Sequence, residues 1–233
     1  MKYVDVNSLS QTIDNVSEAL LFGFDIDRSE KDIIADFIIG RQGKPNSYAD
    51  TFAPTESDMK RDYILFTGEK IKSGAGKCHM IGEEASRLLR KLGLNNDKIN
   101  KALIRADNGL KKQIDKVYKN PGYEYGMYCC RSCSCALWIN LASGGLGNDT
   151  KMLKAGLNYL KKHRDSKGNW NGFPKYYTLY VLNEMDINLA LDELKYIAPL
   201  VERRLKKKKT EEDKFELRRN YMCEQIIEKV NSN

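Results

Sequence analysis

The sequence predicts an all-α protein. Apolar residues recur at helical spacing along most of the 233 residues, and the apolar stretches begin at polar caps and end at glycines or a proline. No segment shows the convincing alternation of apolar and polar residues that a half-buried strand requires. We expect one domain over residues 1–233, with the helices of residues 188–233 packing on the rest of it.

The first half of the chain predicts five helices. The first ends at Gly23, the fourth at Gly93 and the fifth before Pro121. The second carries isoleucines and a phenylalanine at helical spacing, and the third begins with the Thr-x-x-Asp pattern of a capping box at Thr55. The five segments are residues 7–23, 27–43, 55–71, 76–93 and 96–120.

The second half predicts five more helices. A cysteine-containing segment stops at Gly144, where two glycines follow each other. In the last segment, one apolar face is marked by Phe215, Met222, Ile226 and Val230. The five segments are the cysteine segment, residues 148–164, 173–186, 188–208 and 210–230.

The net charge of +7 is unevenly distributed. Residues 202–219 carry nine Lys or Arg and five Asp or Glu, and a basic segment of this kind attracts nucleic acid or acidic partners. However, the acidic residues 211–213 directly follow the lysines, and no aromatic residues interleave with them for base stacking. We therefore expect a solvated helix turn with local charge pairing, and no nucleic-acid partner.

The compartment is also predicted from composition. The sequence has no run of about 18 apolar residues, which argues against a membrane span. Residues 1–27 lack the continuous apolar core and the cleavage site of a secretory signal. We expect a cytoplasmic protein whose six cysteines are free thiols.

Two connections between predicted helices look alike. Each has a helix with a polar end (Arg41 or Arg164), a glycine-containing turn, an aromatic residue (Tyr48 or Trp170) and another helix. Repeated units of this kind predict stacked helical hairpins that share a core. The aromatic residue would fill the gap between successive hairpins.

The second connection, "HRDSKGNWNGFPKYYTLYVLNEM", resembles the repeat of the terpene cyclase and protein prenyltransferase superfamily. The resemblance implies an α/α toroid, here a small or partial ring, with a central aromatic-lined pocket. It does not bring the chemistry of that superfamily. The Asp-x-Asp-Asp and Asp-Asp-x-x-Asp motifs are missing, and Tyr177 stands where a prenyltransferase has a zinc-binding histidine.

Four of the six cysteines lie within seven residues, in the segment "MYCCRSCSCALWINLASGG". Cys129 and Cys133 would share one face of a helix, and His79 from a neighbouring helix could join them around zinc or iron. The alternative is core packing, because free cysteine is among the most buried residue types. We favour packing, which predicts no metal and no other cofactor.

His79 and Glu83 are four residues apart, a spacing suited to joint metal binding or to a histidine oriented by a carboxylate. We favour the alternative, an ordinary surface pair near a helix start. Glu69, Glu83 and Asp107 are the carboxylates that could act as acid or base.

A group of aromatic residues supplies the candidate ligand-binding site, although aromatic residues at helical spacing also serve as core. We expect a small-molecule or peptide ligand in a central aromatic cleft, without a recognisable catalytic set. Two alternatives are an enzyme that acts on an isoprenoid or a glycan, and a structural module whose residues 202–209 contact an acidic partner. The candidate aromatic residues are Tyr128, Trp170, Tyr176, Tyr177 and Tyr180.

Overall fold

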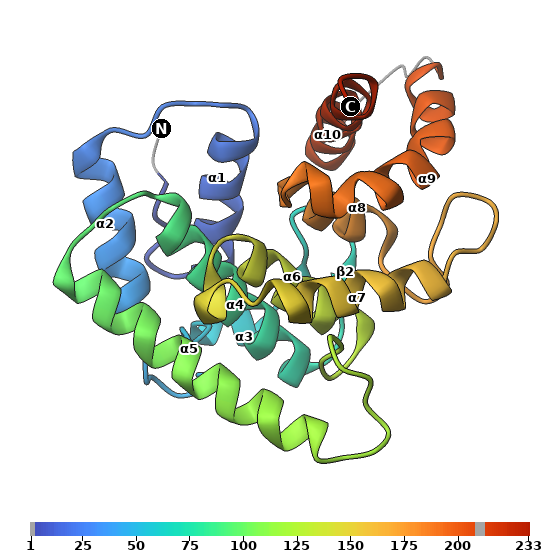
Figure 1. Cartoon of the computed structure of the whole chain (residues 1–233). Helices are drawn as coiled ribbons and strands as arrows, with labels where there is room; N and C mark the ends of the chain where they lie inside the picture. The colour runs from blue at the N-terminus through green and yellow to red at the C-terminus, as the bar shows by residue number, and fades with distance from the viewer. Residues whose placement is uncertain (1–2, 208–212) are drawn as a thin grey trace.

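A computed structural model describes residues 3–207 and 213–233 of the chain. These residues form ten α-helices, one short 3-10 helix and one two-stranded sheet, which confirms the all-α class (Figure 1). The helices are α1 (Leu9–Leu21), α2 (Arg28–Ile39), α3 (Glu56–Lys60), α4 (Gly74–Lys91), α5 (Asp97–Tyr118), α6 (Arg131–Ala142), α7 (Thr150–Lys162), α8 (Lys175–Glu184), α9 (Ile187–Leu205) and α10 (Lys214–Asn231), with the 3-10 helix at Gly145–Gly147.

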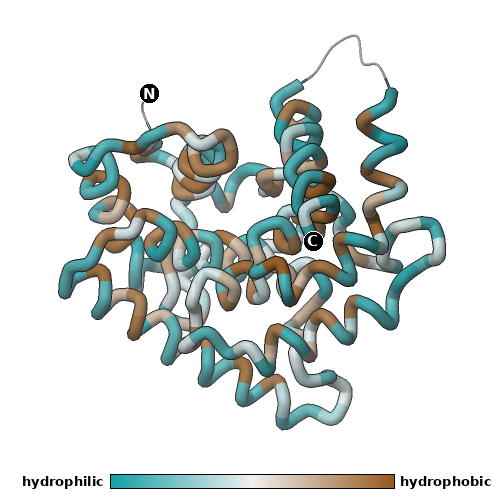
Figure 2. Tube along the Cα trace, turned by 45° about the horizontal axis from the view of Figure 1, so that its top comes forward, coloured by the Kyte–Doolittle hydropathy of each residue, from teal (hydrophilic) through white to brown (hydrophobic). Residues whose placement is uncertain are grey.

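Helices α4 and α6 lie at the centre and pack against each other (Figure 1). Helices α1, α2 and α5 contact α4, while α7 and α8 contact α6. Every residue from Cys133 to Leu141 of α6 is buried, as expected for a helix that others surround on all sides. Helix α8 is also buried on all sides from Tyr177 to Asn183. Helices such as α1, α5 and α7 bury one face each, so apolar residues recur at intervals along them (Figure 2).

The helix expected over residues 55–71 ends much earlier. The capping box at Thr55 is present, since Thr55 Oγ1 accepts a hydrogen bond from the Asp58 amide and the Asp58 side chain accepts one from the Thr55 amide. Beyond α3 the chain forms strands β1 (Tyr63–Ile64) and β2 (Lys70–Ile71), which pair antiparallel. The prediction was wrong because Gly68, with φ of +95°, turns the chain back on itself between the strands.

The two similar connections share a structural feature. Each closes with one antiparallel bridge, Gln42 to Phe52 in the first and Arg164 to Trp170 in the second. Trp170 is buried at the second connection, as the sequence pattern indicated.

The last two helices, α9 and α10, pack on each other and on α8, and α10 also contacts α1 (Figure 1). Among the described residues, no helix combines the length and the apolar character that crossing a membrane requires. The basic segment expected to contact an acidic partner lies partly outside the described residues, because Lys208 and Lys209 are not described.

Candidate metal centre

His79, Cys129 and Cys133 come together in the structure. One ligand atom from each, a ring nitrogen and two sulfur atoms, all lie within 4.8 Å of one another. The three residues come from α4, from the loop before α6 and from the first turn of α6. The predicted metal candidates therefore form a single cluster.

Helix α4 supplies His79 and Glu83, which share one face because they are four residues apart. Both are buried: His79 is 5% exposed and Glu83 is fully buried. The expected surface pair is therefore wrong. His79 Nδ1 and both carboxylate oxygens of Glu83 have no hydrogen-bond partner in the structure, although nearly all buried polar groups in proteins have one.

The cysteine loop differs from the expected continuous helix. Helix α6 begins only at Arg131, and Cys130 is its N-cap, whose sulfur accepts a hydrogen bond from the Cys133 amide at 3.5 Å. Cys129 precedes the helix with φ of +57°, a left-handed conformation that is uncommon for residues other than glycine. Cys129 and Cys133 therefore meet through the turn of the loop and not through a shared helix face.

Burial divides the cysteines into two groups. Cys133 and Cys135 are buried, as the packing interpretation predicts, whereas Cys129 and Cys130 are exposed. Core packing therefore accounts for two of the four cysteines and leaves the exposed pair unexplained.

Contacts between α6, α7 and the loop hold the cysteines in place. Trp138 Nε1 of α6 donates a 2.7 Å hydrogen bond to the Gly126 carbonyl of the loop. Gly126, with φ of +90°, lies so close to Gly156 of α7 that a Cβ atom on Gly126 would stand 2.3 Å from the Gly156 nitrogen. Nearer the cysteines, Ser134 Oγ accepts a hydrogen bond from the Tyr128 amide at 2.9 Å.

Two tyrosine rings enclose the His79 imidazole. The ring of Tyr128 stacks on it with centroids 5.2 Å apart, and Tyr48 contacts it from the loop between α2 and α3. The hydroxyls of Tyr48 and Tyr128 hydrogen-bond to each other. Burial raises the pKa of Tyr48 to about 12 and, together with nearby Glu83, raises that of Tyr128, so both phenols stay neutral.

The surroundings also shift the titration of the histidine and the carboxyl. Burial lowers the pKa of His79 to about 4, so the imidazole is neutral near pH 7. Burial, then nearby Glu84 and Cys130, raises the pKa of Glu83 well above its usual value. Both groups are therefore held in their uncharged forms.

The two thiols of the Cys130-x-x-Cys133 pair shift in opposite directions. Hydrogen bonding from Cys133 lowers the pKa of Cys130 to about 5, against the opposing effect of burial. The same hydrogen bond, followed by burial, raises the pKa of Cys133. Of this pair, Cys130 is the one that loses its proton more readily.

A cavity of about 410 Å³ opens beside the exposed cysteines. Tyr128, Cys129, Cys130 and Arg131 line it, together with residues of the preceding loop and Tyr159 of α7. The Arg131 guanidinium lies over the Phe173 ring, and its buried Nε has no hydrogen-bond partner. The cavity therefore combines access to the cysteine cluster with one basic residue, Arg131, and one acidic residue, Glu124, which pairs with Lys162 at 3.0 Å.

The other two candidate carboxylates lie in structural interactions. Glu69 accepts hydrogen bonds from the backbone amides of Tyr176 and Tyr177, so it caps the start of α8. Asp107 of α5 pairs with Arg90 of α4 at 2.6 Å. Neither belongs to the cluster of His79, Cys129 and Cys133.

The candidate aromatic residues separate into different environments. Tyr128 lies at the cluster, and Tyr176 lines a second cavity near α9. Trp170 is buried and donates to Glu193 at 2.7 Å. Tyr177 and Tyr180 are buried, with hydroxyls bonded to Glu84 at 2.5 Å and to Arg87 at 2.6 Å.

Two residues of the centre were not candidates from the sequence. Tyr48 comes from a distant connection, and only the fold shows that it contacts His79. Arg131 follows the cysteine pair directly, and its position next to them was the signal that could have identified it.

No protein-family model, curated protein sequence or solved structure matches the chain.

Proposed function

We propose that His79, Cys129 and Cys133 bind a zinc ion and that this ion is the functional centre of the protein. The observation that carries the proposal is the convergence of three ligand atoms from separate segments within 4.8 Å. Imidazole nitrogen and thiolate sulfur are the donors that zinc prefers. Tetrahedral Zn–S bonds of about 2.3 Å hold two sulfur atoms about 3.8 Å apart, so movements of about 1 Å close the site.

Burial and charge support the same assignment. Two thiolates neutralise the 2+ charge of zinc, which lowers the cost of burying it beside α4 and α6. Glu83, fully buried and unpartnered on the same face of α4 as His79, is the carboxyl that would orient the histidine. With a metal bound, the His79 imidazole would be a ligand and the Glu83 carboxyl would orient it, so both groups that now lack a partner would have a role.

The fourth coordination position is open in this proposal. Cys130 lies outside the set of three converging ligands, and its sulfur already accepts the Cys133 amide at the start of α6. Because Cys129 is exposed and lines the 410 Å³ cavity, a ligand in that cavity reaches the metal. Three protein ligands and one exchangeable position are typical of catalytic zinc sites, whereas structural sites are closed.

This geometry favours the metal-dependent enzyme among the functions expected from the sequence. Zinc with an open position polarises a carbonyl group or activates a bound water molecule. Arg131 would hold a negatively charged group of the substrate, because it is a lining residue of the cavity and its guanidinium, which lies over the Phe173 ring, forms no ion pair with the described residues.

The finer predictions from the sequence remain proposals beside this one. We propose that the helical hairpins form a partial α/α toroid; the bridges that close the two similar connections support the repeated hairpin on which this proposal is based. The zinc centre does not follow from the superfamily resemblance, because Tyr177, at the position of the prenyltransferase zinc ligand, is buried and bonded to Glu84. The central aromatic cleft, the interaction module and the cytoplasmic location stay predictions.

Cobalt substitution tests the metal site. Co²⁺ bound to thiolates gives sulfur-to-metal charge-transfer absorption that is absent from sites made of oxygen and nitrogen only. We expect this absorption in the reduced wild-type protein and in the control Cys78→Ser, whose half-buried thiol contacts Met59 and lies outside the cluster. In Cys129→Ser and Cys133→Ser we expect it to weaken or disappear.

The same sample tests the open position. Added thiocyanate or imidazole should shift the cobalt d–d bands if the fourth ligand exchanges. An unchanged spectrum would mean a closed structural site and would remove the enzymatic part of the proposal. Equal charge-transfer bands in wild type and Cys129→Ser, or a stable Cys130–Cys133 disulfide in place of metal, would overturn the zinc centre itself.

A further inference from the structure

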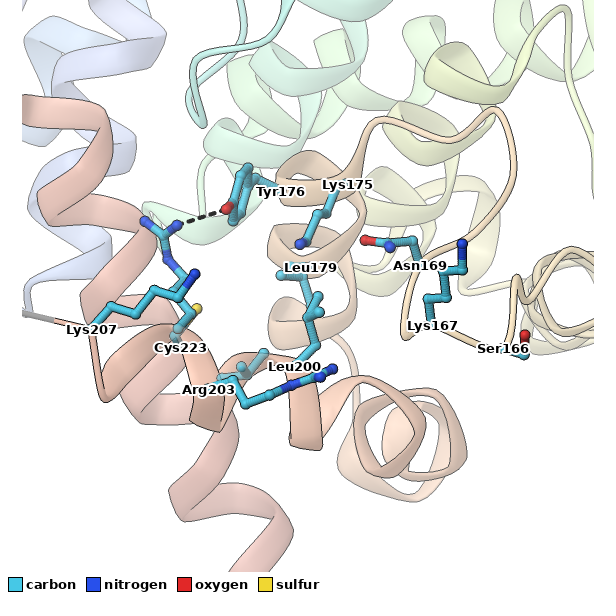
Figure 3. A pocket seen from close by; sticks show the side chains of 12 residues that line it. Ser166, Lys167, Asn169, Lys175, Tyr176, Leu179, Leu200, Arg203, Lys207 and Cys223 are labelled. Atoms are coloured by element: carbon cyan, nitrogen blue, oxygen red, sulfur yellow. Dashed lines mark hydrogen bonds between the residues drawn. The ribbon is translucent and has the colours of Figure 1, made fainter.

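A second cavity, of about 680 Å³, lies between α8, the end of α9 and the connection that precedes α8 (Figure 3). Its volume is in the range of pockets that hold small molecules. It is separate from the zinc centre, with which it shares no lining residue. Five of its lining residues are basic and none is acidic, the basic ones being Lys167, Lys175, Arg203, Arg204 and Lys207.

Most of this positive charge has no acidic partner within the described parts of the chain. Arg204 pairs with Glu216 at 2.7 Å, but its buried Nε has no hydrogen-bond partner. The ammonium groups of Lys167, Lys175 and Lys207 form no ion pair with residues 3–207 or 213–233. Figure 3 shows Lys175 and Lys207 extending toward the space between α8 and α9 from opposite sides.

The half-buried Lys175 is the least solvated of the three lysines. Burial lowers its pKa, and the nearby Arg204 charge lowers it further. Its ammonium lies 5.3 Å from the centre of the Tyr176 ring. A negatively charged group that enters the cavity would therefore stabilise the charged form of Lys175.

The rest of the lining combines apolar side chains with the polar Ser166 and Asn169. Leu179, Leu200 and Val201 form one wall. The Tyr176 ring is fixed between two guanidinium groups, with Arg204 4.9 Å and Arg219 4.3 Å from its centre, and its hydroxyl accepts a 2.7 Å hydrogen bond from Arg204. The cavity therefore offers a charged end and an apolar surface against which an organic group can pack.

We propose that this cavity, the basic cleft, binds a small organic phosphate that carries at least two negative charges. A single carboxylate would neutralise too little of the charge on the four cations other than Arg204, which pairs with Glu216, whereas a phosphate ester or diphosphate matches it. Guanidinium groups bind phosphate oxygens in a planar, two-pronged geometry. The site is a hollow between α8 and α9 that is open to solvent on one side, which fits a compact ligand better than an extended nucleic-acid strand.

Calorimetric titration with inorganic pyrophosphate at constant ionic strength tests the basic cleft. The double variant Lys175→Gln, Arg203→Gln should bind about tenfold or more weakly than wild type, since two charge-assisted contacts are lost. The control Lys154→Gln, Lys195→Gln removes the same charge from exposed positions on α7 and α9 and should change affinity by about twofold or less.

A second double variant, Lys167→Gln with Lys207→Gln, alters only exposed side chains and cannot disturb the core. Because it removes two of the basic residues that line the cleft, it too should weaken binding. Equal affinity of wild type, this variant and the first variant would overturn the proposal, as would equal weakening in the control. The zinc centre is unchanged in all four proteins, so a difference among them reports the cleft alone.

Such a phosphate could belong to a free small molecule or to a lipid headgroup, and binding to vesicles distinguishes these two sources. Wild-type protein should bind pyrophosphate and should not sediment with phosphatidylcholine vesicles that contain phosphatidylserine. Sedimentation with these vesicles combined with no detectable pyrophosphate binding would assign the basic residues to a membrane surface and refute the small-ligand cleft.

Discussion

Gly156 of α7 is the residue whose substitution most directly tests how the fold holds the cysteine loop. In Gly156→Ala, the new Cβ atom would stand 2.3 Å from Trp138 Nε1 and 2.5 Å from Trp138 Cε2. Atoms cannot approach that closely, so the fully buried indole must move and release the Gly126 carbonyl that it contacts at 2.7 Å. Overpacking costs about 1–3 kcal/mol and the lost hydrogen bond about 1 kcal/mol, which together give about 2–4 kcal/mol.

The matched control is Gly74→Ala, at the first position of α4. A Cβ atom on Gly74 would meet only Met59 Cε at 3.7 Å, an ordinary van der Waals contact. Alanine there should leave stability unchanged or raise it by about 0.4–1 kcal/mol. Urea unfolding of the metal-free proteins, followed by circular dichroism and tryptophan fluorescence, measures both variants without the contribution of the metal.

Zinc affinity provides the second measurement for Gly156→Ala. Because the displaced loop carries Cys129, competition with a chromophoric chelator should show affinity lowered by about 10–100-fold, the size of effect known for residues that support metal ligands. If Gly156→Ala were as stable as Gly74→Ala and bound zinc as tightly, the close contact between α6, α7 and the loop would be wrong.

Two further predictions concern stability. Arg87→Met removes a fully buried guanidinium and leaves the buried Glu84 without its 2.8 Å ion pair, so it should lower the free energy of unfolding by about 3–5 kcal/mol. The exposed Arg105→Met should lower it by about 1 kcal/mol or less, and equal losses would contradict the burial assigned to the pair. Burial alone would raise the pKa of Asp58, but hydrogen bonds from Ser8 and other groups outweigh it and lower the pKa. The stabilisation from ionised Asp58 is thus present above the unfolded pKa of about 3.9 and is lost as the pH falls through the lower folded pKa. The free energy of unfolding measured in urea between about pH 5 and 2 should therefore change less in Asp58→Asn than in wild type. Identical profiles would argue against this assignment.

The helical elements were predictable because their signals are local. Periodicity and caps lie within each segment. In the described residues, nine of the ten expected segments contain a helix of at least ten residues, although the helix in the cysteine segment begins only at Arg131. The exception, residues 55–71, shows what local patterns miss: Thr55 starts a helix correctly, but the turn at Gly68 and the pairing of Tyr63 with Ile71 depend on residues that come together only in the fold.

The site was predictable in its parts and not in its assembly. The spacing of Cys129 and Cys133 indicated a shared helix face, yet the sulfur atoms meet because Cys129 adopts a left-handed conformation before α6. The spacing of His79 and Glu83, four residues apart near a helix start, suggested a surface pair, but both side chains are buried, which contradicts that interpretation. Which chain segments lie next to α4 is set by tertiary packing, and no spacing within α4 encodes the approach of Tyr48.

The metal content of the untagged protein, purified without chelator or added metal, tests the central claim most directly. Inductively coupled plasma mass spectrometry should find about one zinc ion per chain in the wild type and in Cys78→Ser, and far less in Cys129→Ser and Cys133→Ser. Protein that folds and holds no metal, with no zinc uptake when it is supplied under reducing conditions, would contradict the zinc centre. The cluster of His79, Cys129 and Cys133 would then be a feature of packing alone.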